Sequence, residues 1–142
     1  MVDDNPKNLQ ILSAVLYKEG HTIVFASNGK QAIEIAQNQS PDLILLDINL
    51  PDIDGFDVCR KLKNNPLTKD IPIIFITGRI ETEDIVLGFR VGAVDYITKP
   101  FNIVELLSRV NTHLNLKRSR DEVIRYSKEL EKTQAELKQA LA

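Results

Sequence analysis

The stretch Leu43–Gly55, with the sequence LILLDINLPDIDG, decides the fold of this chain. Its first four residues are aliphatic, and the segment after them is rich in turn-forming residues. A short apolar run with such boundaries is typical of a strand that is buried on both faces, as in parallel sheets. Asp47 follows this strand directly, so we expect it at the carboxyl edge of the sheet, where open α/β sheets bind their ligands.

The segments around this stretch alternate between strand and helix patterns. Apolar residues at helical spacing predict five helices, the last of which begins at Asn102. The predicted strands besides Leu43–Leu46 are His21–Ala26, Pro72–Thr77 and Ala93–Thr98. Such alternation is typical of βαβ units, in which helices cover both faces of a parallel sheet. Right-handed crossovers make such a sheet doubly wound.

The first strand of the predicted sheet is nearly absent from the sequence. Only Met1 and Val2 precede the acidic pair Asp3 and Asp4. A shortened central strand exposes the edges of its neighbours, so we expect lower stability and a less certain position for the acidic pair. Three interpretations remain open: a start farther upstream, a trimmed chain, or another segment that fills the gap.

Composition indicates one domain of ordinary size and excludes several classes of protein. The net charge of −2 gives no reason to expect nucleic acid or an anionic membrane as a partner. Cys59 is the single cysteine, which rules out an internal disulfide. No apolar run approaches the roughly 18 residues of a membrane span, and no signal-peptide pattern opens the chain. We therefore predict a cytoplasmic protein without membrane or nucleic-acid contacts.

The pattern changes after residue 115. Apolar residues then recur in heptads: Leu116, Val123, Leu130 and Leu137 stand seven residues apart, with Tyr126, Thr133 and Ala140 at the intervening offset. We predict a domain over residues 1–115 and a helical extension over 116–142. The extension is a possible coiled coil or a linker to an output module that this sequence lacks. A solvated, fraying helix is the alternative, and Ser119 and Thr133 weaken the heptad seam.

Several functional groups follow the predicted strands and should meet at one edge of the sheet. Asp3 and Asp4 follow the first strand, Asp47 the third, Thr77 the fourth and Lys99 the fifth. Three clustered carboxylates repel one another unless a cation bridges them, and an all-oxygen ligand set suits Mg²⁺. Asp47 is then a ligand, a nucleophile or both. Lys99 and Thr77 would supply a charge and a hydroxyl to a transferring phosphoryl group.

Over about residues 1–115 the sequence resembles the receiver domain of two-component response regulators, in particular the chemotaxis-regulator-like members. The matching motifs are Val2-Asp3-Asp4, Leu45-Leu46-Asp47 with Pro51 and Gly55, Ile76-Thr77-Gly78, Gly92-Ala93, Asp95-Tyr96 and Lys99-Pro100-Phe101. Each motif is weak alone, but together they occur in order and at the right separations. The resemblance implies a flavodoxin-like, five-stranded parallel sheet of order 2-1-3-4-5, here with a truncated first strand, followed by a long C-terminal helix.

The resemblance also implies roles for individual residues. Asp47 would accept a phosphoryl group from a sensor histidine kinase or a phosphotransfer protein. Mg²⁺ would bind to Asp3, Asp4, Asp47 and the main-chain carbonyl of Asn49. Lys99 would contact the phosphoryl oxygens from a loop in which the Lys99-Pro100 bond is cis.

Further roles concern the response to phosphorylation. Thr77 would move toward the phosphoryl group, and Tyr96 would follow it inward. Asn49 and Arg79 occupy the positions that, in the family this sequence resembles, tune the lifetime of the acyl phosphate. A homodimer is possible through the face between the fourth and fifth helices and through the 116–142 helix. The chain would then be a signalling switch and not an enzyme, apart from its own phosphoryl transfer and autodephosphorylation.

Two other functions fit parts of this pattern. A Mg²⁺-dependent phosphohydrolase of the haloacid dehalogenase type also uses an Asp nucleophile, a Thr and a Lys. That class needs a second Asp two residues after the nucleophile, where this chain has Asn49. A phosphorylation-independent interaction module is the other alternative, because such a module can keep every residue of the acidic pocket.

Overall fold

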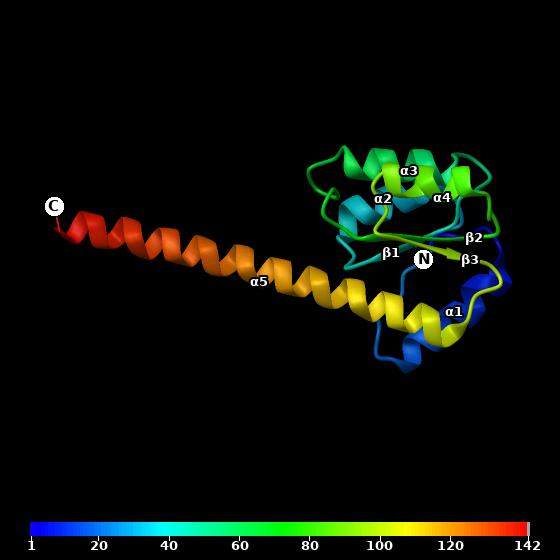
Figure 1. Ribbon diagram of the computed structural model, residues 1–142, viewed down its shortest axis with the longest axis horizontal. Coiled ribbons are helices and arrows are strands. Elements are labelled where there is room, and N and C mark those ends of the chain that lie inside the picture. The colour runs from blue at the N-terminus through cyan, green and yellow to red at the C-terminus, as the bar shows by residue number, and fades with distance from the viewer. Residues whose placement is uncertain (142) are drawn as a thin grey trace.

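Three parallel strands form the centre of the computed structural model, which describes residues 1–141 (Figure 1). The strands are β1 (Ile44–Leu46), β2 (Ile73–Thr77) and β3 (Asp95–Thr98), and they lie in the order β1-β2-β3. In the parallel register Leu46 pairs with Phe75, and Phe75 pairs with Tyr96. The predicted parallel sheet is therefore confirmed, and its three strands end at one edge.

Helices cover both faces of this sheet, as the alternating pattern predicts. They are α1 (Pro6–Lys18), α2 (Gly29–Gln39), α3 (Gly55–Lys63), α4 (Thr82–Arg90) and α5 (Ile103–Leu141). Figure 1 shows α2, α3 and α4 on one face of the sheet and α1 with the first part of α5 on the other. The doubly wound architecture is therefore confirmed.

Alternation along the strands builds two apolar cores, one on each face. Leu46 and Phe75 point into the core that α2 and α3 cover, where Phe56 meets Phe75 edge to face at 5.4 Å between ring centroids. Leu45 and Ile74 point into the opposite core, together with residues of α1 and α5. Because both faces are buried, the strands are continuously apolar.

The first two predicted strands along the chain are each reduced to a single paired residue, Val2 and Ala26. Val2 pairs in parallel with Ala26 on one side and Leu46 on the other. The spatial order is therefore Ala26, Val2, β1, β2, β3, which corresponds to the predicted order 2-1-3-4-5 with Val2 in the place of its first strand. The prediction of a strand over His21–Ala26 is wrong except at Ala26. Within residues 1–141, the ladder beside this segment consists of the Val2 bridge to Ala26, with Ala26 N–H donating to the Met1 carbonyl.

An open groove of about 500 Å³ lies where this ladder stops, between residues 20–26 and 41–45. Val2 N–H donates to the Leu45 carbonyl, and Asp47 N–H donates to the Val2 carbonyl. Successive N–H groups along a strand point alternately to its two neighbours, so Leu45 N–H points to the same side as Asp47 N–H. On that side Leu45 N–H faces the groove. The Met1 amino group lies in the groove, donates to the Val24 carbonyl at 2.9 Å, and has its pKa lowered to about 6 by burial. His21 Nε2 also lines the groove, buried without a hydrogen-bond partner among the described residues.

A four-residue extension rich in Val and Ile, placed directly before Met1, should stabilise the protein. It would continue the ladder on both sides and bury apolar side chains, so we expect the free energy of unfolding to rise by roughly 2–4 kcal/mol. Urea denaturation measures the change. A Gly-Ser extension of the same length supplies backbone groups but no apolar side chains, and should have a much smaller effect. Equal effects of both extensions would contradict this explanation.

The last helix, α5, is the longest element, at 39 residues. Leu106, Val110 and Leu114 in its first half are buried against the sheet, and the second half extends away from the domain (Figure 1). The prediction of one continuous helix is therefore confirmed for the described residues, and Ala142 lies outside them. Within residues 1–141, no helix is long and apolar enough to cross a membrane.

Candidate functional site

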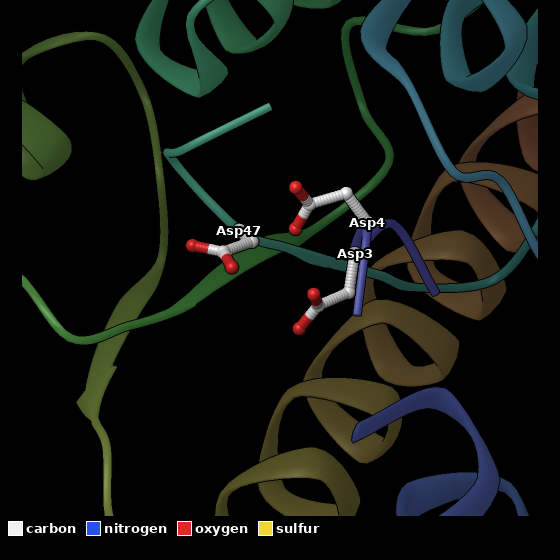
Figure 2. Close-up of side chains that lie close together, drawn as sticks. All are labelled: Asp3, Asp4 and Asp47. Carbon is white, nitrogen blue, oxygen red and sulfur yellow. The ribbon is translucent and has the colours of Figure 1, made fainter. Parts of the chain in front are cut away.

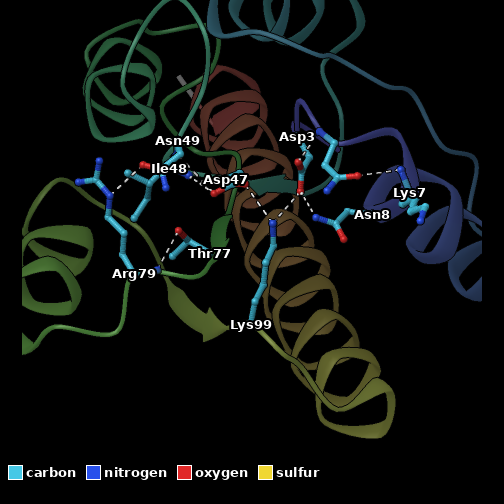
Figure 3. Close-up of polar contacts among 10 residues, drawn as sticks. Asp3, Lys7, Asn8, Asp47, Ile48, Asn49, Thr77, Arg79 and Lys99 are labelled. Carbon is cyan, nitrogen blue, oxygen red and sulfur yellow. Dashed lines mark hydrogen bonds and ion pairs between the residues drawn. The ribbon is translucent and has the colours of Figure 1, made fainter.

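The carboxyl ends of the strands bring together the predicted site residues. Asp3 follows the bridge at Val2, Asp47 follows β1, Thr77 ends β2, and Lys99 follows β3. Figure 3 shows these four side chains converging on one edge of the sheet. The parallel arrangement explains this convergence, because residues that are distant in sequence share an edge once the strands align.

Three of the carboxylates form a tight cluster (Figure 2). One oxygen from each of Asp3, Asp4 and Asp47 lies within 4.8 Å of the other two. Asp3 and Asp47 are buried, whereas Asp4 is exposed. Neighbouring ligands of an octahedral Mg²⁺ lie about 3 Å apart and opposite ligands about 4 Å apart, so a small closure would let these oxygens share one ion. The donor set therefore fits a hard divalent cation.

Lys99 provides positive charge within this cluster. Its Nζ atom lies 2.9 Å from Asp3 Oδ2 and 3.0 Å from Asp47 Oδ2. Burial opposes the charge on Lys99, but hydrogen bonds to Asp3 and Asp47 outweigh it and raise the pKa of the ammonium group. The Lys99-Pro100 peptide bond is cis, as the resemblance to receiver domains implies. Lys99 therefore stays protonated at neutral pH and partly offsets the repulsion between the two buried carboxylates.

Asp47 is oriented by the backbone that follows it. Its Oδ1 atom accepts a hydrogen bond from Ile48 N–H at 2.7 Å, while Oδ2 faces Lys99. The chain then turns back so that Gly55 N–H donates to the Ile48 carbonyl at 2.8 Å. A Cβ atom at Gly55 would lie only 2.4 Å from the Asp47 carbonyl oxygen. This close approach is the reason for the glycine in the Asp47–Gly55 motif.

Replacing Gly55 with Ala should destabilise the protein and disturb the acidic cluster. The clash is with backbone atoms of Asp47 and Ile48, which cannot move without shifting the loop. We expect the free energy of unfolding to fall by roughly 2–4 kcal/mol, measured by urea denaturation. Gly78→Ala is the matched control, because a Cβ there meets nothing within 4 Å. Equal losses in the two variants would contradict the close-approach explanation.

Arg79 connects the remaining predicted residues. Its Nε atom donates to Asn49 Oδ1 at 3.0 Å, and its backbone N–H donates to the Thr77 hydroxyl at 3.3 Å. Its carbonyl accepts from the Tyr96 hydroxyl at 2.7 Å. Burial raises the pKa of Tyr96 to about 12, so this hydroxyl stays protonated and remains a donor. Arg79 thus contacts Asn49, Thr77 and Tyr96, three of the predicted site residues.

Three residues outside the predicted site hold parts of it in place. Asn8, in the first turn of α1, donates from Nδ2 to Asp3 Oδ2 at 3.3 Å. Asp52 accepts from the backbone N–H groups of Gly29 and Lys30, which lower the pKa of its carboxyl group and tie the loop after β1 to α2. Asp54 caps α3 through Phe56 N–H. Neither Asn8 nor Asp52 stands in a local sequence pattern that would predict these contacts between distant segments.

Comparison with known proteins decides the family. A family model described as the response regulator receiver domain matches residues 1–111. The chain belongs to this family. The receiver domain of the sensor histidine kinase PA1611 from Pseudomonas aeruginosa, solved with magnesium coordinated in its active site cleft, matches with a TM-score of 0.75 and 31% identity over 80% of this chain and 93% of that one.

Curated relatives include short and long proteins. Protein PilH of Pseudomonas aeruginosa is 39% identical over 80% of this receiver chain and 94% of its own length. A probable cyclic di-GMP phosphodiesterase of Vibrio cholerae is 44% identical and matches 100% of this chain, the extension included, but only 34% of its own length. The receiver chain thus spans about a third of that relative. The predicted family and its role in two-component signalling are confirmed.

Proposed function

We propose that Asp47 of this receiver domain is the phosphoacceptor of a Mg²⁺-dependent switch. The observation that carries the proposal is the cluster itself. Three carboxylates have oxygens within 4.8 Å of one another, and the Lys99 ammonium group forms ion pairs with Asp3 and Asp47. Asp3, Asp4 and Asp47 would hold Mg²⁺, together with the main-chain carbonyl of Asn49. The bound ion would neutralise charge between the carboxylates and the incoming phosphoryl group.

The transfer step follows from the positions of the side chains. A carboxylate oxygen of Asp47 attacks the phosphorus atom of a phosphohistidine while the bond between phosphorus and nitrogen breaks, and the nitrogen keeps the electron pair. The Lys99 ammonium group stabilises the negative oxygens of the phosphoryl group during transfer. The partner that supplies the phosphoryl group is a sensor histidine kinase or a phosphotransfer protein.

The switch itself would pass through Arg79. The Thr77 hydroxyl accepts from Arg79 N–H, and the Arg79 carbonyl accepts from the Tyr96 hydroxyl. If Thr77 turns toward a phosphoryl group, it releases Arg79 N–H and changes the segment that holds Tyr96. A second copy of the chain would respond to this change through the face between α4 and α5 and through the extended helix. Asn49, bonded to Arg79, would influence the lifetime of the acyl phosphate.

One experiment tests the proposal. The purified chain is incubated with acetyl phosphate and Mg²⁺, and its intact mass is measured over time. We expect one phosphoryl group per chain, no addition after the metal is chelated, and slow loss when the donor is removed. No addition under any donor would contradict the proposal and favour a phosphorylation-independent interaction module.

The same experiment separates the switch from an enzyme. A phosphohydrolase would release many phosphate ions per chain from phosphate esters without accumulating a stable adduct. Such an enzyme needs an Asp at position 49 as a general acid, but this chain has Asn49 there, and its Oδ1 accepts a hydrogen bond from Arg79 at 3.0 Å. We therefore propose that the chain catalyses only its own phosphoryl transfer and dephosphorylation.

A further inference from the structure

The free half of α5 carries an apolar stripe on its exposed surface. Leu116, Val123, Leu130 and Leu137 occupy the first heptad position, and Tyr126, Thr133 and Ala140 the fourth. All seven are exposed, although the helix runs through them without a break. We propose that this stripe is the contact surface of a parallel, in-register coiled coil between two copies of the chain. The inference rests on the association proposed above, but it does not require phosphorylation.

The stripe faces away from the domain to which α5 belongs. Leu106, Val110 and Leu114 bury the domain-facing side of the helix. At about 100° per residue, Leu116 lies roughly 160° from Leu114, on nearly the opposite side. Two helices can therefore join along the stripe while each keeps its own domain on the outside. Residues at the same seam positions upstream, Arg109 and Thr112, are polar, so the apolar contact begins at Leu116.

The charges beside the stripe select the parallel orientation. Glu122, Glu129 and Glu136 all occupy the seventh heptad position. In an antiparallel pair the seventh positions of the two helices face each other, so these glutamates would repel across the contact. In a parallel pair Glu122 faces Ser127 of the partner helix, Glu129 faces Gln134 and Glu136 faces Leu141, none of which carries a charge. The sequence thus penalises one orientation and leaves the other free of repulsion.

Polar contacts fix the beginning of this extension on the domain. The Arg120 guanidinium donates to the Asp70 carbonyl at 2.7 Å, and Lys117 Nζ lies 3.9 Å from Asp42 Oδ1. Lys117 lies on the domain-facing side of α5, whereas Arg120 lies one turn after Leu116 and flanks the beginning of the stripe. The direction of the stripe is therefore set by the domain, and a change in the domain can reach the paired helices.

Sedimentation of the full chain over a range of concentrations tests the contact surface. Leu130→Ser should raise the dissociation constant of the dimer about a hundredfold, because each dimer loses two buried leucine side chains. Ile124→Ser is the matched control, because the exposed fractions of the two side chains are nearly equal, 47% for Ile124 and 46% for Leu130. Ile124 lies off the stripe, so its replacement should leave the dissociation constant nearly unchanged. Neither variant touches the domain core. Equal behaviour of the two variants would overturn the assignment of the surface.

Disulfide cross-linking tests the orientation. Ser119→Cys chains should cross-link to each other under mild oxidation, because position 119 faces itself in a parallel, in-register pair. In the antiparallel register that aligns the two seams, position 119 of one chain meets position 137 of the other. The two copies of position 119 then lie about 27 Å apart. A mixture of Ser119→Cys and Leu137→Cys chains that forms mainly mixed disulfides would overturn the proposal. The unaltered chain, whose Cys59 is buried, controls for other cross-links.

These outcomes are independent of the phosphorylation assay. A chain that takes up one phosphoryl group but stays monomeric would contradict the coiled coil and leave the switch intact. A chain that forms the parallel dimer without any uptake would contradict the switch alone.

Discussion

Asp47→Asn should abolish phosphoryl uptake from acetyl phosphate. The amide group has no anionic oxygen to attack phosphorus, and no other residue is placed to replace it at the end of β1. The amide oxygen can accept from either Ile48 N–H or Lys99 but not from both, whereas the carboxylate accepts from both. The cost to stability should stay near 1–2 kcal/mol, roughly one hydrogen bond to a charged group. The variant should therefore be folded but inactive as an acceptor.

Intact-mass measurement in excess Mg²⁺ checks this result, and the exposed Asp57 provides the control. Asp57→Asn removes a carboxylate that pairs with Arg60 on the surface of α3, so this variant should take up one phosphoryl group like the unaltered chain. Uptake by Asp47→Asn at the same rate would mean that Asp3 or Asp4 is the acceptor. Circular dichroism and urea denaturation establish that both variants are folded before the comparison is made.

Much of the fold could be predicted because the informative patterns are local. The apolar run before Asp47 shows a strand buried on both faces, and the alternation with helices gives the parallel sheet. Position at the carboxyl end of a strand is enough to bring Asp47, Thr77 and Lys99 together. The single free cysteine, Cys59, is buried in α3, as its helical, apolar context indicates.

Other features could not be predicted, because they depend on partners that are distant in sequence. His21–Ala26 has the composition of a strand, but composition does not reveal that, among the described residues, only Ala26 of this segment pairs, with Val2. The hydrogen bond between Arg79 and Asn49 spans 30 residues, and no spacing rule links these two positions. The resemblance gives each of them a tuning role, but their contact emerges only when the loops after β1 and β2 lie side by side.

Lys99→Ala should change metal binding and phosphoryl transfer in opposite directions. Lys99 neutralises two of the three carboxylates that would bind Mg²⁺. Removal of the ammonium group leaves the charge of these carboxylates uncompensated. At an effective dielectric constant near 20, two unit charges in one such site interact by about 3 kcal/mol, and partial exposure to solvent reduces this value. Loss of the repulsion between Lys99 and a bound Mg²⁺ therefore corresponds to roughly ten- to hundredfold tighter Mg²⁺ binding. Phosphoryl uptake should fall about 100-fold, because the transferring group loses its positively charged partner.

Isothermal titration with Mg²⁺ and the time course of phosphoryl uptake measure the two effects on the same preparation. Lys7→Ala removes an exposed positive charge from α1 and should change both values little. Opposite changes distinguish a specific role of Lys99 from loss of folding, since an unfolded variant would lose metal binding and uptake together. Weaker Mg²⁺ binding in a folded Lys99→Ala chain would show that Lys99 acts mainly by holding Asp3 and Asp47 in position, and not as a charge that the metal must overcome.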